Sequence, residues 1–183
     1  MHRTLSVINA QAIMLRQIVG AQRWSDLFFI IGSIAGEIMD PFMQAAIEEA
    51  QLGLAEGGIP IGSVIVHKGQ IIGRGHNRRV QEGSAIKHGE MDAFENAGRL
   101  PARTYKESVL YTTLSPCAMC SGAILLYGIQ RIVVGENQTF MGEEALLRSR
   151  GVEVDVVQDH TCIELMRGFI ASKPELWNED IGE

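Results

Sequence analysis

The sequence contains little cysteine and few aromatic residues. Of its 183 residues, three are cysteines and 6% are aromatic. Three cysteines, two of them in a Cys-x-x-Cys pair, do not make the disulfide framework of a small secreted protein. We therefore expect reduced thiols and a cytoplasmic location.

Long hydrophobic runs and excess positive charge are also missing. The most apolar run, residues 27–35, is shorter than the roughly 20 residues that a membrane-spanning helix needs. Arginines precede it, but the run starts late for a signal peptide and no small-residue cleavage site follows. The net charge of −6 argues against binding nucleic acid through its phosphates. We expect neither a membrane nor a nucleic-acid partner, and a composition with 46% hydrophobic residues fits one globular domain.

The first 38 residues read differently from the rest of the chain. Residues 10–19 could form a short helix, but nothing links this segment to the motifs downstream. Asp40-Pro41 is a strong helix start, with Asp40 as the N-cap and Pro41 at the first helical position. We expect the functional domain to span residues 39–183. Residues 1–38 would then be an N-terminal extension without a function of its own: an appended helix, a targeting remnant or the result of an upstream start codon.

From Pro41 onward, helix and strand patterns alternate along the chain. Apolar residues at helical spacing predict helices, and β-branched apolar runs predict strands. The predicted helices are 41–56, 88–97, 116–128, 143–150 and 161–172, and the predicted strands are 61–66, 71–75, 109–114, 131–135 and 152–157. Residues 77–86 are polar and predict a loop. This alternation indicates an α/β fold, a mixed sheet with helices on both faces.

Three residues have the types and spacing of zinc ligands. His88 opens one predicted helix, and Cys117 and Cys120 open another. Residues three apart on a helix share a face, about 5–6 Å apart at Cβ, and a helix N-terminus favours thiolates. One imidazole and two thiolates leave a fourth tetrahedral position to water, as in catalytic zinc sites, whereas structural sites normally have four protein ligands. We expect one zinc ion per subunit.

Each half of this pattern is weak evidence by itself. A Cys-x-x-Cys pair can be a thioredoxin-like redox site, and His-x-Glu is common at helix starts. Their combination, with each half at a predicted helix start, favours zinc, which lowers the pKa of a bound water from about 15.7 toward about 7. Glu90, two residues past His88, is placed to move protons rather than to bind the metal.

The pattern His-x-Glu followed by Pro-Cys-x-x-Cys marks the zinc-dependent nucleobase deaminases. From Asp40 on, the chain resembles the fungal-type cytosine deaminases of the cytidine deaminase superfamily. The resemblance is strongest in residues 57–62, 73–77, 88–90, 110–122, 133–137 and 177–183. It implies a three-layer α/β/α sandwich with a central five-stranded mixed sheet, and a homodimer. The zinc motif is shared across the superfamily, whereas the tail 177–183 is more specific to this branch.

The resemblance also implies a role for individual residues. His88, Cys117 and Cys120 would hold the zinc, and Glu90 would be the proton shuttle. The residues that it places at the substrate are Asn77, which would hydrogen-bond the pyrimidine, Asp180, the ring-covering aromatics Phe140 and Trp177, and the pocket-lining Ile61, Gly89 and Ser115. Without the resemblance, Asn77 reads as a turn residue, Trp177 as core and Asp180 as part of a solvated tail. His76 reads as a loop residue without a clear role, and Cys162 as core.

The leading interpretation is hydrolysis of free cytosine, a small-molecule nucleobase, to uracil and ammonia. The nearest alternative is the same chemistry on another amidine-like ring, such as isocytosine, guanine or creatinine. A tRNA adenosine deaminase shares the zinc motif, but the acidic charge and the tail argue against it. The chain departs from the fungal type at residues 91–93 and after Phe140. Asp92 is expected either to face the dimer contact or to tune the pocket.

Overall fold

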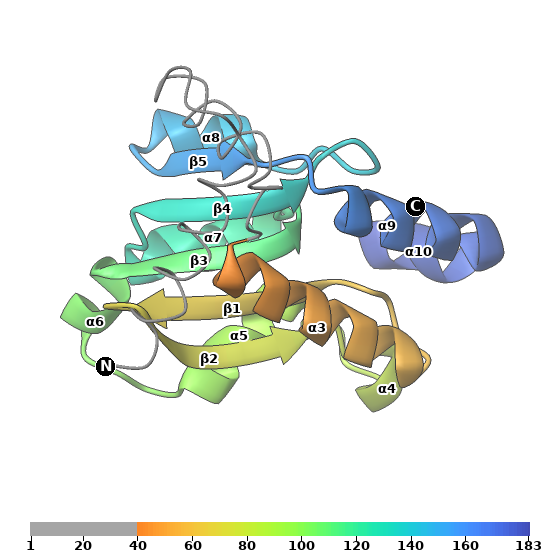
Figure 1. Cartoon of the computed structure of the whole chain (residues 1–183), viewed down its shortest axis with the longest axis horizontal. Helices are drawn as coiled ribbons and strands as arrows, with labels where there is room; N and C mark the ends of the chain where they lie inside the picture. The colour runs from red at the N-terminus through yellow and green to blue at the C-terminus, as the bar shows by residue number, and fades with distance from the viewer. Residues whose placement is uncertain (1–39) are drawn as a thin grey trace, which may run out of the picture. The chain divides into compact units, whose positions relative to one another are not determined.

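The computed structural model describes residues 40–183, in which five strands form one mixed sheet (Figure 1). The strands are β1 (Gly62–His67), β2 (Gln70–His76), β3 (Ser108–Leu114), β4 (Arg131–Glu136) and β5 (Glu153–Val156), in the spatial order β2-β1-β3-β4-β5. Strand β1 is antiparallel to both of its neighbours, whereas β3, β4 and β5 are parallel. The carboxyl ends of β2, β3, β4 and β5 therefore share one edge with the start of β1. The extension 1–38 and the helix predicted at 10–19 lie outside the described residues.

Helices cover both faces of the sheet, which confirms the predicted three-layer α/β/α sandwich. The larger helices are α3 (Pro41–Ala55) and α9 (His160–Ser172) on one face, and α5 (Gly89–Ala97) and α7 (Ala118–Tyr127) on the other (Figure 1). Side chains that alternate along β1 enter two separate cores. Val64 and Val66 pack with residues of α3 and α9, and Ile65 packs with residues of α5 and α7. None of the helices formed by residues 40–183 is long and apolar enough to cross a membrane.

Helix α3 begins where the sequence predicts. The carboxylate of Asp40 accepts a hydrogen bond from the backbone N–H of Phe42 at 2.8 Å, and Pro41 occupies the first helical position. The helix ends before Gly57, which has a left-handed φ of 90°. This placement matters for function because α3 packs along β1 and β2, which lead to the site.

Helix α5 lies unusually close to β2 because β2 contains two glycines that face it. A Cβ atom on Gly73 would lie 2.3 Å from the carbonyl oxygen of Ala93, and one on Gly75 would lie 2.4 Å from the nitrogen of Ala93. No side chain larger than hydrogen fits at either position. The close contact sets the start of α5, and with it His88, beside the end of β2.

Three short helices are absent from the sequence prediction. They are α4 (Arg79–Glu82), α6 (Ala102–Lys106) and α10 (Pro174–Ile181). The prediction of a loop over 77–86 was wrong at α4, a single polar turn with no buried residue and so no apolar period to detect. The prediction of 161–172 as the last helix was wrong as well. Pro174 starts α10, whose Trp177 packs into a small core with Phe169 of α9.

Candidate metal centre and pocket

The candidate site lies at the sheet edge where β1 begins and the other strands end. The backbone N–H of Asn77, just after β2, donates to the carbonyl of Ile61, just before β1, at 2.8 Å. The N–H of Ser115, just after β3, donates to the carbonyl of Glu136 at the end of β4 at 3.0 Å. The strand order thus brings together segments that are far apart in the sequence.

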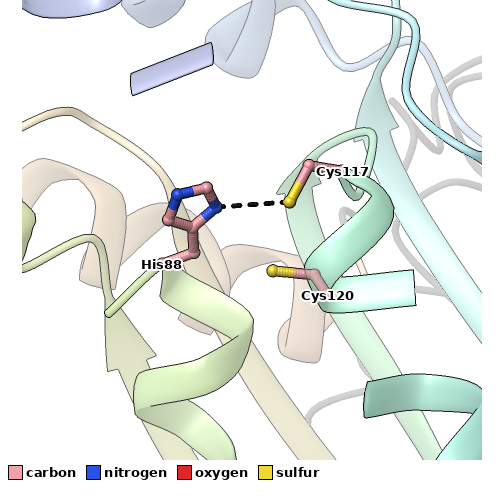
Figure 2. A group of neighbouring side chains, drawn as sticks. All are labelled: His88, Cys117 and Cys120. Carbon is pink, nitrogen blue, oxygen red and sulfur yellow. Dashed lines mark hydrogen bonds between the residues drawn. The ribbon is translucent and has the colours of Figure 1, made fainter. Parts of the chain in front are cut away.

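The three predicted zinc ligands meet at this edge. His88 is the N-cap residue of α5 and Cys117 is the N-cap residue of α7, while Cys120 is buried one helical turn further along α7. Their ligand atoms all lie within 4.8 Å of one another. Figure 2 shows the imidazole of His88 turned toward the thiol of Cys117. Among residues 40–183 this is the one group of His, Cys, Asp or Glu side chains close enough to hold a metal.

The geometry and the donor types fit zinc. The Nδ1 atom of His88 lies 3.5 Å from Sγ of Cys117. Two ligands of a tetrahedral zinc, with bonds of about 2.0 Å to nitrogen and about 2.3 Å to sulfur, are about 3.5 Å apart. The other ring nitrogen, Nε2, faces Asp180 Oδ1 at 3.8 Å. Nδ1 is therefore the nitrogen placed to bind the metal, and the carboxylate behind the ring favours that orientation.

The thiols of Cys117 and Cys120 have different pKa values. The Cys120 thiol donates a hydrogen bond to Cys117, and this bond, with help from His88, lowers the pKa of Cys117 to about 4 although burial opposes the shift. The same hydrogen bond and burial raise the pKa of Cys120. Cys117 is thus a thiolate at neutral pH before any metal binds. Binding of zinc then has to displace one further thiol proton.

Glu90 lies at the second position of α5 and lines the same pocket as His88 and Cys117. Its side chain is only 3% exposed. Burial, with a smaller contribution from the Cys117 thiolate, raises the pKa of Glu90 above the usual value of a glutamate. A carboxyl group of this kind accepts and holds a proton more readily than a surface glutamate does.

A pocket of about 440 Å³ opens over the metal centre. It is lined by most of the residues that the resemblance places at the substrate, together with Glu90 and two of the three metal ligands: Ile61, His88, Glu90, Ser115, Cys117, Phe140, Trp177 and Asp180. Asn77 and Gly89 do not line it. Asn77 is fully buried behind Asp180, and Gly89 lies against the backbone of Ile61, where a Cβ would come within 2.9 Å of the carbonyl oxygen.

Asn77 and Asp180 are joined by hydrogen bonds across 103 positions of sequence. The side-chain amide of Asn77 donates to both carboxylate oxygens of Asp180, at 3.2 and 3.1 Å. Its carbonyl accepts the backbone N–H of Arg79 at 3.0 Å, while the Arg79 guanidinium donates to Asp180 at 2.8 Å. The interpretation of Asp180 as part of a solvated tail was therefore wrong. Asn77 does begin a turn, as predicted without the resemblance. It is buried, however, and it hydrogen-bonds two pocket-lining residues, Arg79 and Asp180.

Two aromatic side chains form one wall of the pocket. Phe140, from the loop after β4, and Trp177, on α10, lie edge to face with ring centroids 5.9 Å apart. Trp177 is 5% exposed, as expected for a core residue, and the apolar cluster around it includes Ile61. Helix α10 thereby supplies four lining residues, Trp177, Glu179, Asp180 and Ile181.

Sequence reasoning missed three residues that support the site. Arg79 pairs with Asp180, and Glu144 accepts hydrogen bonds from Ser115 Oγ at 2.9 Å and from Asn137 at 3.0 Å. His76 is fully buried beside Asn77. No local pattern singles these residues out, because each acts through a contact with a distant segment. Cys162, in contrast, is buried in the core as predicted.

Comparison with known proteins bears on this arrangement. Residues 37–136 match the cytidine and deoxycytidylate deaminase zinc-binding region. The chain is 58% identical over 142 residues to the cytosine deaminase of Candida albicans. The alignment covers 77% of this chain and 95% of that protein. It is 40% identical over 133 residues to the tRNA-specific adenosine deaminase of Streptococcus pyogenes serotype M18, covering 72% and 81% respectively. A solved structure from work on A-to-I editing by tRNA:A34 deaminases superposes with a TM-score of 0.57 at 27% identity, over 68% of this chain and 97% of that one.

Proposed function

The chain belongs to the cytidine and deoxycytidylate deaminase family of zinc enzymes, and from this premise we propose that it hydrolyses free cytosine to uracil and ammonia. One observation carries the proposal. Two members of the His88, Cys117 and Cys120 group, His88 and Cys117, line one pocket with the buried Glu90 and with residues of α10. The 58% identity to a cytosine deaminase, over most of both chains, favours cytosine as the ring.

The residues around the metal suit this chemistry. A zinc ion held by His88, Cys117 and Cys120 would supply an activated water. Glu90 lines the same pocket and would pass one proton of that water to the ring nitrogen and then move the second proton to the departing ammonia. Its raised pKa suits a group that must hold a proton between these two transfers.

The remaining pocket residues are proposed to bind the base. Asn77 donates its amide to Asp180, and the remaining lone pair of its carbonyl is proposed to accept from an N–H of the pyrimidine. The carboxylate of Asp180, 3.8 Å from Nε2 of His88, is proposed to accept a hydrogen bond from the exocyclic amine. Phe140 and Trp177 cover the ring. Ile61 and Ser115 complete the lining, and Gly89 is proposed to act behind it, against the backbone of Ile61.

A panel of free bases tests this function. Purified, zinc-loaded protein is assayed for ammonia release from cytosine, isocytosine, guanine, adenine, creatinine and the nucleoside cytidine. We expect cytosine to have the highest kcat/KM. Strong turnover of a different ring with none of cytosine would reject the substrate while leaving the reaction class intact. We also propose residues 39–183 as the catalytic domain, and the same panel run on that segment should give the same order of substrates.

A tRNA adenosine deaminase is the second candidate, favoured by the 40% identity to the streptococcal enzyme. The net charge of −6 disfavours it, because affinity for RNA depends largely on phosphate contacts with Lys and Arg. We expect no tRNA binding at physiological salt and no inosine in tRNA incubated with the protein. Inosine formation at the wobble position would make tRNA editing the function.

We propose a homodimer formed through α7. A helix that is apolar on all sides is normally buried on all sides. Helix α7 is apolar throughout, yet Ala118, Gly122 and Leu126, four residues apart in turn, are exposed, and Leu126 is 79% exposed. A second copy of the chain would cover this stripe. Light scattering after size exclusion should give twice the chain mass, and Leu126→Glu should give a monomer.

The cysteine chemistry supports a reducing compartment. All three cysteines are free, and two of them are the proposed metal ligands, which must stay reduced to bind zinc. We therefore propose a cytoplasmic location, where conversion of free cytosine to uracil serves pyrimidine salvage. Fractionation of the native source, with activity recovered outside the cytosol, would contradict this placement.

A further inference from the structure

His76, the last residue of β2, has both ring nitrogens engaged in a buried position. Its side chain is fully buried. Nδ1 lies 3.1 Å from a carboxylate oxygen of Glu49, and Nε2 lies 2.9 Å from a carboxylate oxygen of Glu56. Both glutamates come from α3 or its C-cap. The sequence interpretation of His76 as a loop residue was therefore wrong, because His76 ends β2 and is buried.

This geometry fixes the charge of the ring. A carboxylate only accepts hydrogen bonds, so both ring nitrogens must carry a hydrogen to donate to Glu49 and Glu56. The ring is then an imidazolium, a buried cation that is stable only when it is paired. The pKa of Glu56 is lowered, chiefly by the hydrogen bond from His76, as expected for a carboxylate that faces a cation.

Further ion pairs extend from both sides of the ring, with positively and negatively charged side chains alternating. Arg74 on β2 donates to Glu49 at 2.7 Å, and Arg78 lies 3.7 Å from Glu56. Arg78 also donates to Asp92 of α5 at 3.0 Å. The outer members of the network are Glu48, which pairs with Arg74, Lys87, which pairs with Asp92, and Gln81, which donates to Glu56.

The nearest charges on both sides of the ring alternate in sign. Arg74, Arg78 and an imidazolium face Glu49, Glu56 and Asp92, and Glu48, Glu82 and Lys87 lie further out. Helix α3 is also shaped for the ring, because a Cβ on Gly53 would lie 3.0 Å from His76 Cδ2. The ring thus sits in a formed socket.

The socket holds the backbone on both sides of Asn77. The N–H of His76 donates to Asp92 at 3.2 Å, the N–H of Asn77 donates to Ile61 at 2.8 Å, and Arg78 follows with its own bond to Asp92. Asp92 was expected to face the dimer contact or to tune the pocket. It is buried and accepts hydrogen bonds from the turn that carries Asn77, and both expectations stay predictions.

We propose that His76 is a positioning residue, a buried imidazolium clamped between Glu49 and Glu56 that sets the orientation of Asn77 and, through it, of Asp180 in the pocket. The inference rests on the proposed role of Asn77 in binding the base. The residues that determine affinity for the substrate would then include a charged residue, His76, that does not line the pocket.

The protonation state is tested without any substrate. Two-bond ¹H–¹⁵N correlation spectra of the zinc-loaded protein at neutral pH should show His76 with both ring nitrogens protonated. In Glu56→Gln, the Nε2 resonance should shift most. A neutral tautomer of His76 in the unmodified protein would overturn the proposal.

The positioning role is tested by kinetics with a matched control. His76→Gln should raise KM for cytosine by about tenfold and change kcat by less than about threefold, because uniform binding is lost while the chemistry is kept. Zinc content by metal analysis should stay at one per chain. The milder Glu56→Gln should raise KM about threefold. His160→Gln, at an exposed position on α9, should change neither constant. An unchanged KM in His76→Gln and Glu56→Gln, or loss of zinc and folded protein in both, would overturn the role.

A double-mutant cycle shows whether His76 acts through Asn77. In an Asn77→Ala background, His76→Gln should cause little further loss of kcat/KM, whereas independent residues would give additive losses. Additive losses would overturn the proposal. If the base panel identifies another ring as the substrate, the cycle is run with that ring. Failure of the proposed substrate is then distinct from failure of the positioning role, which the NMR measurement also tests by itself.

Discussion

Two carboxylates share the pocket but differ in their surroundings. Glu90 faces the thiols at the start of α7, and burial raises its pKa. Asp180 instead accepts hydrogen bonds from Asn77 and Arg79. Separate environments of this kind suit two carboxyl groups in one pocket to different roles. Asp180 is accordingly a binding group and Glu90 a proton carrier in our proposal.

Glu90→Gln should separate metal binding from turnover. The amide keeps the shape of the side chain but cannot carry the proton, so kcat should fall by at least about 100-fold while zinc content stays at one per chain. Ammonia release and metal analysis measure the two effects. Glu95→Gln, on the same helix but exposed, is the control and should retain full activity. Full activity of Glu90→Gln would show that another group moves the protons.

Removal of zinc should expose one cysteine selectively to alkylation. In chelator-treated protein at neutral pH, iodoacetamide should modify Cys117 at least about 100-fold faster than Cys162, because only the former is a thiolate. The pKa of Cys117 is lowered to about 4, whereas burial raises that of Cys162. Peptide mass spectrometry gives both rates, and reloading with zinc should protect Cys117. Faster modification of Cys162 in the folded protein would contradict this assignment.

At the scale of elements, the contact of α5 with β2 places His88. Gly73 and Gly75 permit that contact because their absent side chains make room for the backbone at Ala93. The zinc site therefore depends on two glycines that are not metal ligands themselves. Replacement of either glycine should strain the packing of α5 on β2 without removing a metal ligand.

Two glycine substitutions should have opposite effects on stability. Gly75→Ala places a methyl group 2.4 Å from the nitrogen of Ala93 and should lower the free energy of unfolding by about 1–3 kcal/mol. Gly168→Ala, at an exposed position inside α9 with no atom within 4 Å, should raise it by about 0.5–1 kcal/mol. Urea unfolding of both zinc-loaded variants gives the comparison. A neutral Gly75→Ala would mean that α5 can move away at little cost.

The sequence predicts the elements that have a strong period and the ligands that are close together in the chain. Asp40-Pro41 marks the start of α3, and the zinc pattern lies within residues 88–120. Helix α4 was missed because one polar turn has no apolar period. His76 could not be assigned because its partners, Glu49 and Glu56, are 27 and 20 positions away. Such contacts depend on how helices pack on the sheet, which local patterns do not specify.

At the scale of the whole molecule, two apolar cores on opposite faces of the sheet stabilise the fold. Buried carboxylates at the edge of the sheet add a dependence on pH. Hydrogen bonds from Asn137, Ser115 and Arg148 lower the pKa of Glu144, although burial alone would raise it. A carboxylate whose pKa is lower in the folded state stabilises that state above the unfolded value and loses this contribution as the pH falls.

Acid should therefore unfold the protein partly through Glu144. The free energy of unfolding should decrease as the pH falls below the usual glutamate value of 4.5. Glu144→Gln should be less stable at neutral pH by about 1–3 kcal/mol and should lose less on acidification. Urea midpoints at several pH values measure both effects. Glu164→Gln, on the surface of α9, is the control, and an equal pH slope in both variants would reject the role of Glu144.

The two halves of the site are closed by chain segments of different length. His88 and Cys117 are 29 positions apart, whereas Asn77 and Asp180 are 103 apart. Closing the longer segment costs about 1 kcal/mol more in chain entropy. During folding, we expect the zinc ligands to be able to assemble while α10 is still undocked.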